Sequence, residues 1–447
     1  MIKRLMLVFV VVTCCSCLSA QDRKIEFNEY NLDNGLHVIL QQNNSTPIIA
    51  ITVTYHVGSK NEKPDRTGFA HFFEHLMFEG SPNIKRGEYF QYVQNAGGEL
   101  NAYTSFDQTV FYEVLPSNQI ELGLWLESER MLHLKVDSIG VETQRGVVKE
   151  ERKQTLENRP YGSILEQTFS HAYKVHPYRW VPIGSVQYID RASLQEFMNF
   201  YKTFYVPNNA VLSISGDFDS GKMKDLVKKY FGDIPKGTQN IFRPDAVEPA
   251  QTSEAVDTVY DNIQLPAVIK AFHIPARGTD DYYAIDMLTT LLSSGQSSRL
   301  YKELVDKQQK ALDVGSFPFS LENPGLFLVY SFANMGVKVN ELNKSIDDEI
   351  SKVQTTLISE NEFEKLRNQI ENDFVKSKDT DLGIATSLAD YYLFYSGNTN
   401  LINTELERYR KVTREDIQRV ANEYLTAKNE TMLYYLPKPI QQSKEGK

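Results

Sequence analysis

The sequence predicts an α+β fold made of two duplicated domains, each a mainly antiparallel sheet covered by helices. The chain has 447 residues, more than one hydrophobic core usually organises. Strand-like and helix-like patterns alternate in both halves, and several strands follow one another directly, which is typical of α+β domains. Both halves also end with a helix pattern, an asparagine and a strand, at 193–214 and at 413–435. This repeat indicates an internal duplication.

The individual elements follow from hydrophobic periodicity and from runs of β-branched residues. In the first half we predict strands at 36–40, 47–57 and 110–115, and helices at 68–78, 122–131 and 141–156. In the second half we predict strands at 268–272 and 325–332 and a helix at 282–292. Residues 246–255 contain Pro249 and few large apolar side chains. We therefore expect a linker there, between a first domain at 21–245 and a second at 256–447.

Residues 1–20 have the three parts of a secretory signal peptide. A positive start is followed by an apolar run at 5–12 and by small residues up to Ala20. We expect export, with the periplasm as the destination. All three cysteines lie in this segment, and lipoprotein anchoring through Cys15 or Cys17 is the minority alternative, since the flanking residues fit it poorly.

The composition of the chain argues against a nucleic-acid partner and against a transmembrane span. The formal net charge is -10, and Lys and Arg are interleaved with Asp and Glu. A nucleic-acid partner is therefore not expected, because phosphate binding needs a concentrated basic face. No later stretch approaches 18 uninterrupted apolar residues, so we expect no transmembrane span in the mature chain.

The pattern His71-Phe72-Phe73-Glu74-His75 predicts a metal site. The two histidines are four residues apart on a predicted helix, so both rings project from one face. This spacing suits two imidazole ligands of one zinc ion. Glu74 lies beside them and can serve as the general base and acid. The alternative is a helix that carries these residues by accident, and the site needs a third ligand.

Acidic residues on the helix predicted at 141–156 are candidates for that ligand. We take Val147 and Val148 as the apolar anchors of this helix. Glu151 lies four and three residues from these anchors and satisfies both, whereas Glu150 satisfies only one. A solvated charged face is the alternative interpretation.

Further segments carry a recognisable pattern: 67–80 around the two histidines, 95–104 and 107–109 after a Gly-Gly pair, 145–151 around Glu151, and 176–217. Together they resemble the pitrilysin-type, or inverzincin, zinc metallopeptidases. The chain is most similar to the branch of the mitochondrial processing peptidase β subunit and its exported bacterial relatives. The resemblance covers nearly the whole mature chain and is most specific at 60–217.

The resemblance implies a role for each site residue. His71, His75 and Glu151 would bind one Zn²⁺ per chain, and Glu74 would be the catalytic general base. The first domain would then be the catalytic peptidase domain and the second a homologous domain. One departure concerns Gln144, where relatives often carry a second glutamate, so that charge is missing here.

A short strand after Gly97-Gly98 is the candidate substrate site. In the family, the matching segment is a sheet edge that pairs with the substrate backbone, a form of β-augmentation. The resemblance therefore implies substrate contacts at Asn101, Ala102 and Thr104. The alternative is an ordinary edge strand.

The second half carries Arg299, which resembles an arginine that contacts substrate together with a tyrosine in active relatives. The tyrosine's register falls at Leu312. We therefore expect a heterodimer in which a related chain supplies the Arg/Tyr pair, with a homodimer as the alternative. The predicted function is that of a zinc-dependent endopeptidase acting on peptides or unfolded polypeptides. A non-catalytic structural or peptide-binding subunit of the same fold is the alternative.

Overall fold

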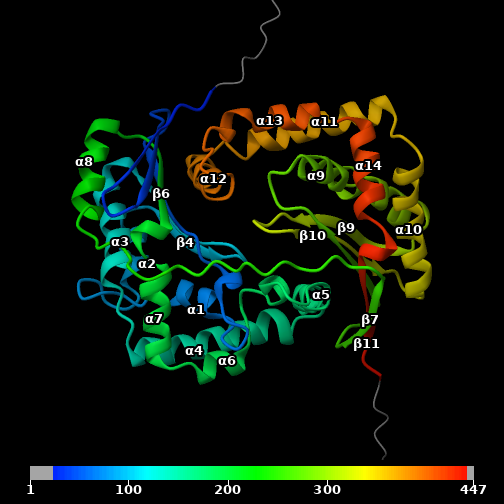
Figure 1. Cartoon of the computed structure of the whole chain (residues 1–447), viewed down its shortest axis with the longest axis horizontal. Helices are drawn as coiled ribbons and strands as arrows, with labels where there is room; N and C mark the ends of the chain where they lie inside the picture. The colour runs from blue at the N-terminus through cyan, green and yellow to red at the C-terminus, as the bar shows by residue number, and fades with distance from the viewer. Residues whose placement is uncertain (1–23, 440–447) are drawn as a thin grey trace, which may run out of the picture.

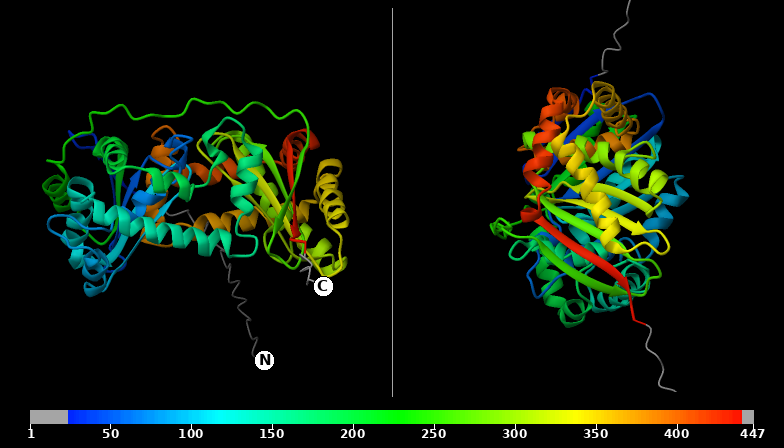
Figure 2. Two further views of the ribbon diagram at one scale, coloured as in Figure 1. Left: turned by 90° about the horizontal axis from the view of Figure 1, so that it is seen from below. Right: turned by 90° about the vertical axis from the view of Figure 1, so that its right-hand side faces the viewer.

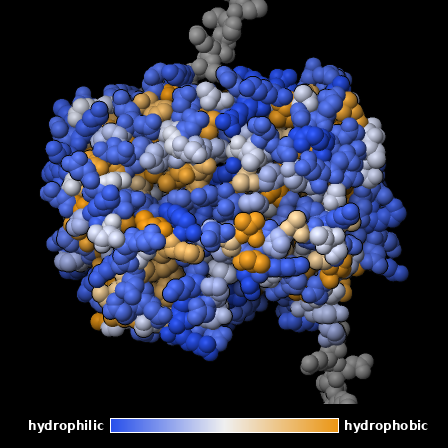
Figure 3. All heavy atoms as spheres, in the orientation of Figure 1, coloured by the Kyte–Doolittle hydropathy of each residue, from blue (hydrophilic) through white to orange (hydrophobic). Residues whose placement is uncertain are grey.

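The computed structural model describes residues 24–439, which form two sheets flanked by helices (Figure 1). The predicted signal peptide at 1–20, with its three cysteines, lies outside the described residues. Within the described part, no helix has the length and apolar character needed to cross a bilayer. The face seen in Figure 3 is mainly hydrophilic, with scattered apolar patches.

The first sheet has the strand order β1-β2-β6-β3-β5-β4. Its strands are β1 (Asn28–Asn31), β2 (His37–Gln42), β3 (Ile48–Tyr55), β4 (Glu99–Thr104), β5 (Thr109–Pro116) and β6 (Ala210–Gly216). β2 and β6 pair in parallel, and the other pairs are antiparallel. Among the strands that the structure describes, β4 lies at one edge and pairs with β5 alone.

The second sheet repeats this arrangement with the order β7-β11-β8-β10-β9. Its strands are β7 (Ala255–Asp261), β8 (Ala267–Ile274), β9 (Ala311–Phe319), β10 (Gly325–Ala333) and β11 (Glu430–Pro437). β7 and β11 pair in parallel, and the other pairs are antiparallel. Five strands of the first sheet, β2-β6-β3-β5-β4, thus have counterparts in the same order. The predicted fold class is confirmed.

Helices cover both sheets (Figures 1 and 2). The first half supplies α1 (Phe69–Leu76), α2 (Glu88–Asn95), α3 (Ile120–His133), α4 (Ser138–Arg152), α5 (Ile164–Ala172), α6 (Val186–Arg191), α7 (Leu194–Phe204) and α8 (Ser220–Phe231). The second half supplies α9 (Asp280–Ser293), α10 (Val339–Thr355), α11 (Glu360–Lys376), α12 (Asp381–Phe394), α13 (Leu401–Lys411) and α14 (Arg414–Tyr424). The elements that were predicted lie within a few residues of these bounds. The elements that were not predicted are β1, β7, β9, α2, α5, α6, α8 and α10 to α13.

Each half of the chain lends one helix to the sheet of the other half. Phe169 of α5 lies in one buried cluster with Ile269 of β8. Leu388 of α12 lies in one buried cluster with Ile39 of β2 and Val211 of β6. The two sheets are therefore joined by packing as well as by the chain segment that runs along one side of the molecule (Figure 2).

Aromatic packing fixes helix α1, which carries the two histidines of the predicted metal site. Phe72 and Phe73 are fully buried, and each contributes about 1.5–3 kcal/mol by leaving water. The ring of Phe197 on α7 stacks on Phe69 and Phe72 at centroid distances of 4.7 and 4.6 Å. Phe200 stacks on Phe73 at 5.5 Å. The apolar face of α1 is thus held against α7, which leaves the opposite face for polar residues.

Candidate metal centre

Two histidines of α1 and one glutamate of α4 come together in the structure. Glu151 Oε1 lies 3.5 Å from His71 Nε2, and Glu151 Oε2 lies 3.2 Å from His75 Nε2. One ligand atom from each of the three residues can be chosen so that all lie within 4.8 Å of one another. Among residues 24–439, this is the one group of three or more His, Cys, Asp or Glu side chains that meets this condition.

The start of α1 is set by a residue that the sequence did not reveal. The buried carboxyl of Glu62 accepts hydrogen bonds from Gly68 N at 2.9 Å and from Ala70 N at 2.8 Å. Burial raises its pKa to about 8, against the lowering effect of these backbone hydrogen bonds. Gly184 packs so closely that a Cβ there would lie 2.2 Å from Gly68 N. The first turn of the helix is therefore fixed from two sides.

Helix α4 presents Glu151, but not for all the reasons expected from the sequence. Val148 is buried at 3% exposure, as predicted for an anchor. Val147 is 45% exposed, so it faces solvent and its use as a second anchor was wrong. Glu150 is exposed and accepts a hydrogen bond from Gln154 at 3.0 Å. Glu151, three residues from Val148, is the acid that faces the histidines.

The donor set fits zinc. Two imidazole nitrogens and one carboxylate are the ligand types of catalytic zinc sites, which use three protein ligands and leave a further position free. Hydrogen bonding to His71 and His75 holds the pKa of Glu151 well below its ordinary value, although partial burial opposes this shift. The carboxyl is thus kept ionised, the form that binds a cation.

Glu74 lies beside this cluster and points toward the sheet edge. The Thr104 hydroxyl, at the end of β4, donates a hydrogen bond to Glu74 Oε2 at 2.6 Å. β4 alternates so that Glu99, Asn101 and Tyr103 are exposed, whereas the residues between them are half-buried. Because Thr104 belongs to the half-buried face and contacts Glu74, that face of β4 is turned toward α1.

Within residues 24–439, the outer side of β4 has no strand partner, since this strand ends the sheet. Asn101 is exposed, and its Oδ1 accepts a hydrogen bond from Ala102 N at 2.9 Å. Thr104 is engaged by Glu74, so among the predicted substrate residues it is the one linked directly to the candidate catalytic carboxyl. An unpaired edge next to this carboxyl can accept an extended chain by main-chain hydrogen bonding.

In the described part of the chain, Arg299 pairs with an acid of its own half and not with a residue of the metal cluster. Its guanidinium donates to both carboxylate oxygens of Glu362 on α11, at 2.8 and 2.7 Å. Leu312, in the register of the family tyrosine, is 61% exposed on β9. The second half therefore supplies an arginine already paired with an acid, and an apolar residue at the second position.

Gln144 links the two helices that carry the candidate ligands. Its Nε2 donates to Oε1 of Glu79, just beyond the end of α1, at 2.5 Å. Glu79 is 5% exposed and also forms an ion pair with Arg86. The Gln144 amide thus donates a hydrogen bond to a buried carboxylate.

The chain is similar to known peptidases over nearly its whole length. Residues 37–179 match the sequence profile of insulinase (peptidase family M16), and residues 191–370 match that of the peptidase M16 inactive domain. The chain is 32% identical over 433 residues to a zinc protease, PqqE, of Helicobacter pylori, covering 96% of this chain and 97% of that protein. It is 24% identical over 422 residues to the probable mitochondrial-processing peptidase subunit beta of Arabidopsis thaliana, covering 92% and 78%.

Solved structures show the same fold. A protease from Helicobacter pylori matches with a TM-score of 0.89 and 31% identity, covering 92% of this chain and 100% of that one. The periplasmic protease PqqL from Escherichia coli matches with a TM-score of 0.76 and 17% identity, covering 93% of this chain and 48% of that one. At this identity the second match shows the fold alone.

Proposed function

Because this chain belongs to peptidase family M16, we propose that it is a zinc-dependent endopeptidase that hydrolyses peptides or unfolded polypeptides. The observation that carries the proposal is the approach of Glu151 to both His71 and His75, with the Glu74 carboxyl beside them. These residue types, in this arrangement, suit metal-assisted hydrolysis of an amide.

In this proposal His71, His75 and Glu151 hold one Zn²⁺ per chain. The ion, when bound, supplies Lewis-acid chemistry that acidifies water to a pKa of about 7 and polarises a carbonyl group. Glu74 takes up the proton of the attacking water at Oε1, since Oε2 already accepts the Thr104 hydroxyl. The same carboxyl then returns the proton to the leaving amine nitrogen, which makes that nitrogen a better leaving group.

Substrate would bind along the free edge of β4. The main chain at Asn101 and Ala102 would pair with an extended peptide, and the exposed Asn101 side chain would add a contact to the peptide backbone. Main-chain pairing depends little on side-chain identity, which suits varied and unfolded substrates. A folded protein offers few such free strands.

A partner chain would complete the enzyme. This chain matches about half the length of PqqL, and Arg299 is engaged by Glu362 within its own half. We propose a heterodimer in which a related chain supplies a free Arg/Tyr pair. A homodimer is the alternative, with Arg299 released from Glu362 on assembly and Leu312 in place of the tyrosine.

Export to the periplasm is part of the proposal and is supported by the pattern at 1–20. The second candidate function, a non-catalytic subunit of the same fold, is favoured by one observation: residues 191–370 match a domain described as inactive. The candidate metal and base residues lie outside that range.

Metal analysis combined with Glu74→Gln separates these functions. The purified wild-type protein, with its native partner, should contain about one zinc per chain. Glu74→Gln should retain that zinc and lose activity by about 10²–10⁴-fold, the usual range for a general base. Glu151→Gln should lose zinc, whereas the matched control Glu150→Gln, at an exposed neighbour, should keep both zinc and activity. A wild-type protein without zinc, or full cleavage by Glu74→Gln, would overturn the proposal.

A further inference from the structure

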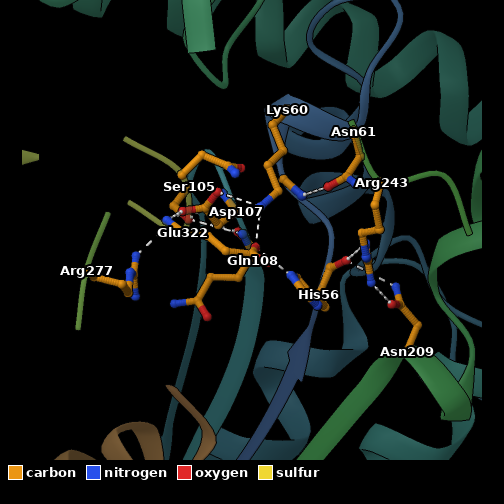
Figure 4. A network of polar contacts seen from close by, with 12 residues as sticks. His56, Lys60, Asn61, Ser105, Asp107, Gln108, Asn209, Arg243, Arg277 and Glu322 are labelled. Atoms are coloured by element: carbon orange, nitrogen blue, oxygen red, sulfur yellow. Dashed lines mark hydrogen bonds and ion pairs between the residues drawn. The ribbon is translucent and has the colours of Figure 1, made fainter. Parts of the chain in front are cut away.

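The two halves of the chain meet at the short turn that joins β4 to β5. Ser105 N donates to Gln108 O at 2.8 Å, which closes a turn around Phe106 and Asp107. Figure 4 shows Asp107 at the centre of a network of polar side chains that come from both halves. The metal cluster and the predicted substrate residues do not include this turn, although it directly follows Thr104.

The Asp107 carboxylate is fully buried and is contacted from both halves. From the first half, Lys60 Nζ lies 2.9 Å from Oδ1, and the Tyr178 hydroxyl donates to Oδ1 at 2.6 Å. From the second half, Glu322 N donates to Oδ2 at 2.9 Å, and Arg277 Nη2 lies 3.6 Å from Oδ2. One carboxylate therefore joins the β4–β5 turn to the hairpin between β9 and β10.

The main chain of the turn is held as well. Ser59 N donates to Ser105 O at 3.2 Å, and Lys60 N donates to Phe106 O at 3.0 Å. Gly58 approaches so closely that a Cβ there would lie 2.4 Å from Phe106 O. Lys60 thus holds the turn through both its main chain and its side chain. A shift of this turn would break both the main-chain hydrogen bonds and the side-chain contacts.

Charge balance suggests that the network fixes geometry more than it adds stability. Lys60 pairs with Asp107 and Glu322, and Arg277 pairs with Asp107. Lys60 and Asp107 are 2% and 0% exposed. Buried ion pairs lose hydration and often contribute little net stability, but they hold their partners in one arrangement. β4 needs such restraint because an edge strand has a neighbour on one side only. The network restrains β4 at the end nearest Glu74.

We propose that Asp107 is a positioning residue for peptide binding: it uses the second half of the chain to hold the β4 edge in the geometry that pairs with an extended peptide. This inference rests on the proposed function. The coupling runs from Asp107 through the turn to Thr104, three residues earlier, and from the Thr104 hydroxyl to Glu74. A displacement of this strand of the order of 1 Å can cost about 100-fold in an enzyme.

The experiment measures peptide binding without turnover. The full-length Glu74→Gln protein, zinc-loaded and with its native partner, is titrated into a fluorescein-labelled unstructured peptide, and anisotropy gives Kd. Adding Asp107→Asn should raise Kd by about tenfold or more, with zinc content unchanged. In a protein that keeps Glu74 and can cleave the peptide, Asp107→Asn should raise KM by a similar factor. Arg277→Gln removes the guanidinium that the second half places beside Asp107. It should also raise Kd, but by a smaller factor than Asp107→Asn.

The matched control is Tyr173→Phe. The Tyr173 hydroxyl donates to Pro324 O in the same hairpin at 2.8 Å, so its loss weakens the docking of the halves but removes no hydrogen bond of the β4–β5 turn, and the ring that packs beside Tyr178 is kept. It should lower the melting temperature but leave Kd within about twofold, which is within the error of additive effects.

The outcomes separate the two proposals. If the Glu74→Gln protein binds no peptide, the proposed function and this inference both fall. If it binds peptide and Asp107→Asn binds equally well, only this inference falls. If Tyr173→Phe weakens binding as much as Asp107→Asn, the effect is general loosening and the positioning role is rejected. Should Asp107→Asn not fold, Arg277→Gln decides: an unchanged Kd rejects the inference and a raised Kd supports it.

Discussion

Gln144→Glu tests whether the link between α1 and α4 sets the metal centre. Gln144 Nε2 donates to Glu79 Oε1 at 2.5 Å, and Glu79 is 5% exposed. The substitution changes one nitrogen to an oxygen, so the shape of the side chain is kept. The donor is lost, and a second carboxyl is placed against a buried carboxylate.

The expected cost follows from the charges. Two like charges about 4 Å apart repel by about 4 kcal/mol at an effective dielectric constant near 20. Arg86, which already pairs with Glu79, offsets part of this repulsion, so we expect a loss of about 2–3 kcal/mol at pH 8. This loss lowers the melting temperature by about 2–7 °C, for a cooperative unit between one half and the whole of the chain.

The loss should depend on pH with a definite sign. The introduced carboxyl has a folded-state pKa above its unfolded value, because the like charge disfavours its ionised form. A group of this kind binds a proton more tightly when folded, so its stability contribution is retained at acid pH and lost as pH rises. The variant should therefore approach wild-type stability near pH 5, where one proton can be shared between the carboxyls.

Urea or thermal melts at several pH values provide the assay, with two controls. Gln144→Ala should cost about 1–3 kcal/mol, the price of one lost partner, without the added pH dependence. The exchange Glu79→Gln with Gln144→Glu restores one amide and one carboxyl and should recover most of the loss. Chelator competition should show weaker zinc binding in Gln144→Ala by about tenfold, because Glu151 lies on the same helix. A Gln144→Glu protein as stable as wild type at pH 8 would refute the reasoning.

Three further predictions concern other parts of the chain. Glu113 and Glu127 are both buried beside a single arginine, Arg130. Either Gln substitution leaves one carboxylate to pair with Arg130 and should cost less than about 1.5 kcal/mol of unfolding free energy, whereas the double substitution leaves the arginine unpaired and should cost about 3–5 kcal/mol. If urea melts gave a double-mutant cost equal to the sum of the single costs, this reasoning would be contradicted. Burial and Glu127 raise the pKa of Glu113, so Glu113→Gln should remove a loss of stability that the wild type shows as pH rises. Gly146→Ala, where a Cβ meets nothing within 4 Å, should stabilise α4 by about 0.5–1 kcal/mol in thermal melts with zinc content unchanged, and a destabilised protein would argue against a helix there. Arg299→Ala should lower stability by about 0.2–1 kcal/mol, as Glu362→Ala should, and leave cleavage by the native assembly unchanged; a selective loss of cleavage would show that Arg299 contacts substrate.

Local patterns predicted the part of the site that depends on local geometry. His71 and His75 face one way because they are four apart on a helix, and Glu74 follows from its place between them. Glu151 was selected over Glu150 by its distance from apolar anchors. That selection agrees with the geometry although Val147, one of the two anchors, is exposed. A helix with one buried anchor still fixes its faces, because the period of 3.6 residues determines the others.

Long-range contacts left no comparable signal. Glu62 supports the start of α1 from outside the helix, and a lone acid in a loop carries no recognisable pattern. Asp107 is contacted by residues 60, 178, 277 and 322, which are far apart in the sequence. The sequence therefore does not show that these residues meet. The packing of α5 and α12 on the sheet of the other half could not be predicted from the sequence either. The pattern of an amphipathic helix shows that the helix has an apolar face, but it does not show which sheet covers that face.

The duplicated fold explains why one half can be specialised for chemistry and the other for support. α1 lies between β3 and β4 in the chain, and α9 lies between β8 and β9, the corresponding strands of the second sheet. α1 keeps three polar residues half-buried on one face, whereas the residues of α9 from Tyr283 to Leu292 are mostly buried and apolar. A helix buried in this way has no free face for a metal site, so the second copy acts on the first through α12, which packs on β2 and β6, and through its turns. The hairpin between β9 and β10 is such a turn, and it reaches the first half at Asp107, next to the strand on which peptide binding would depend.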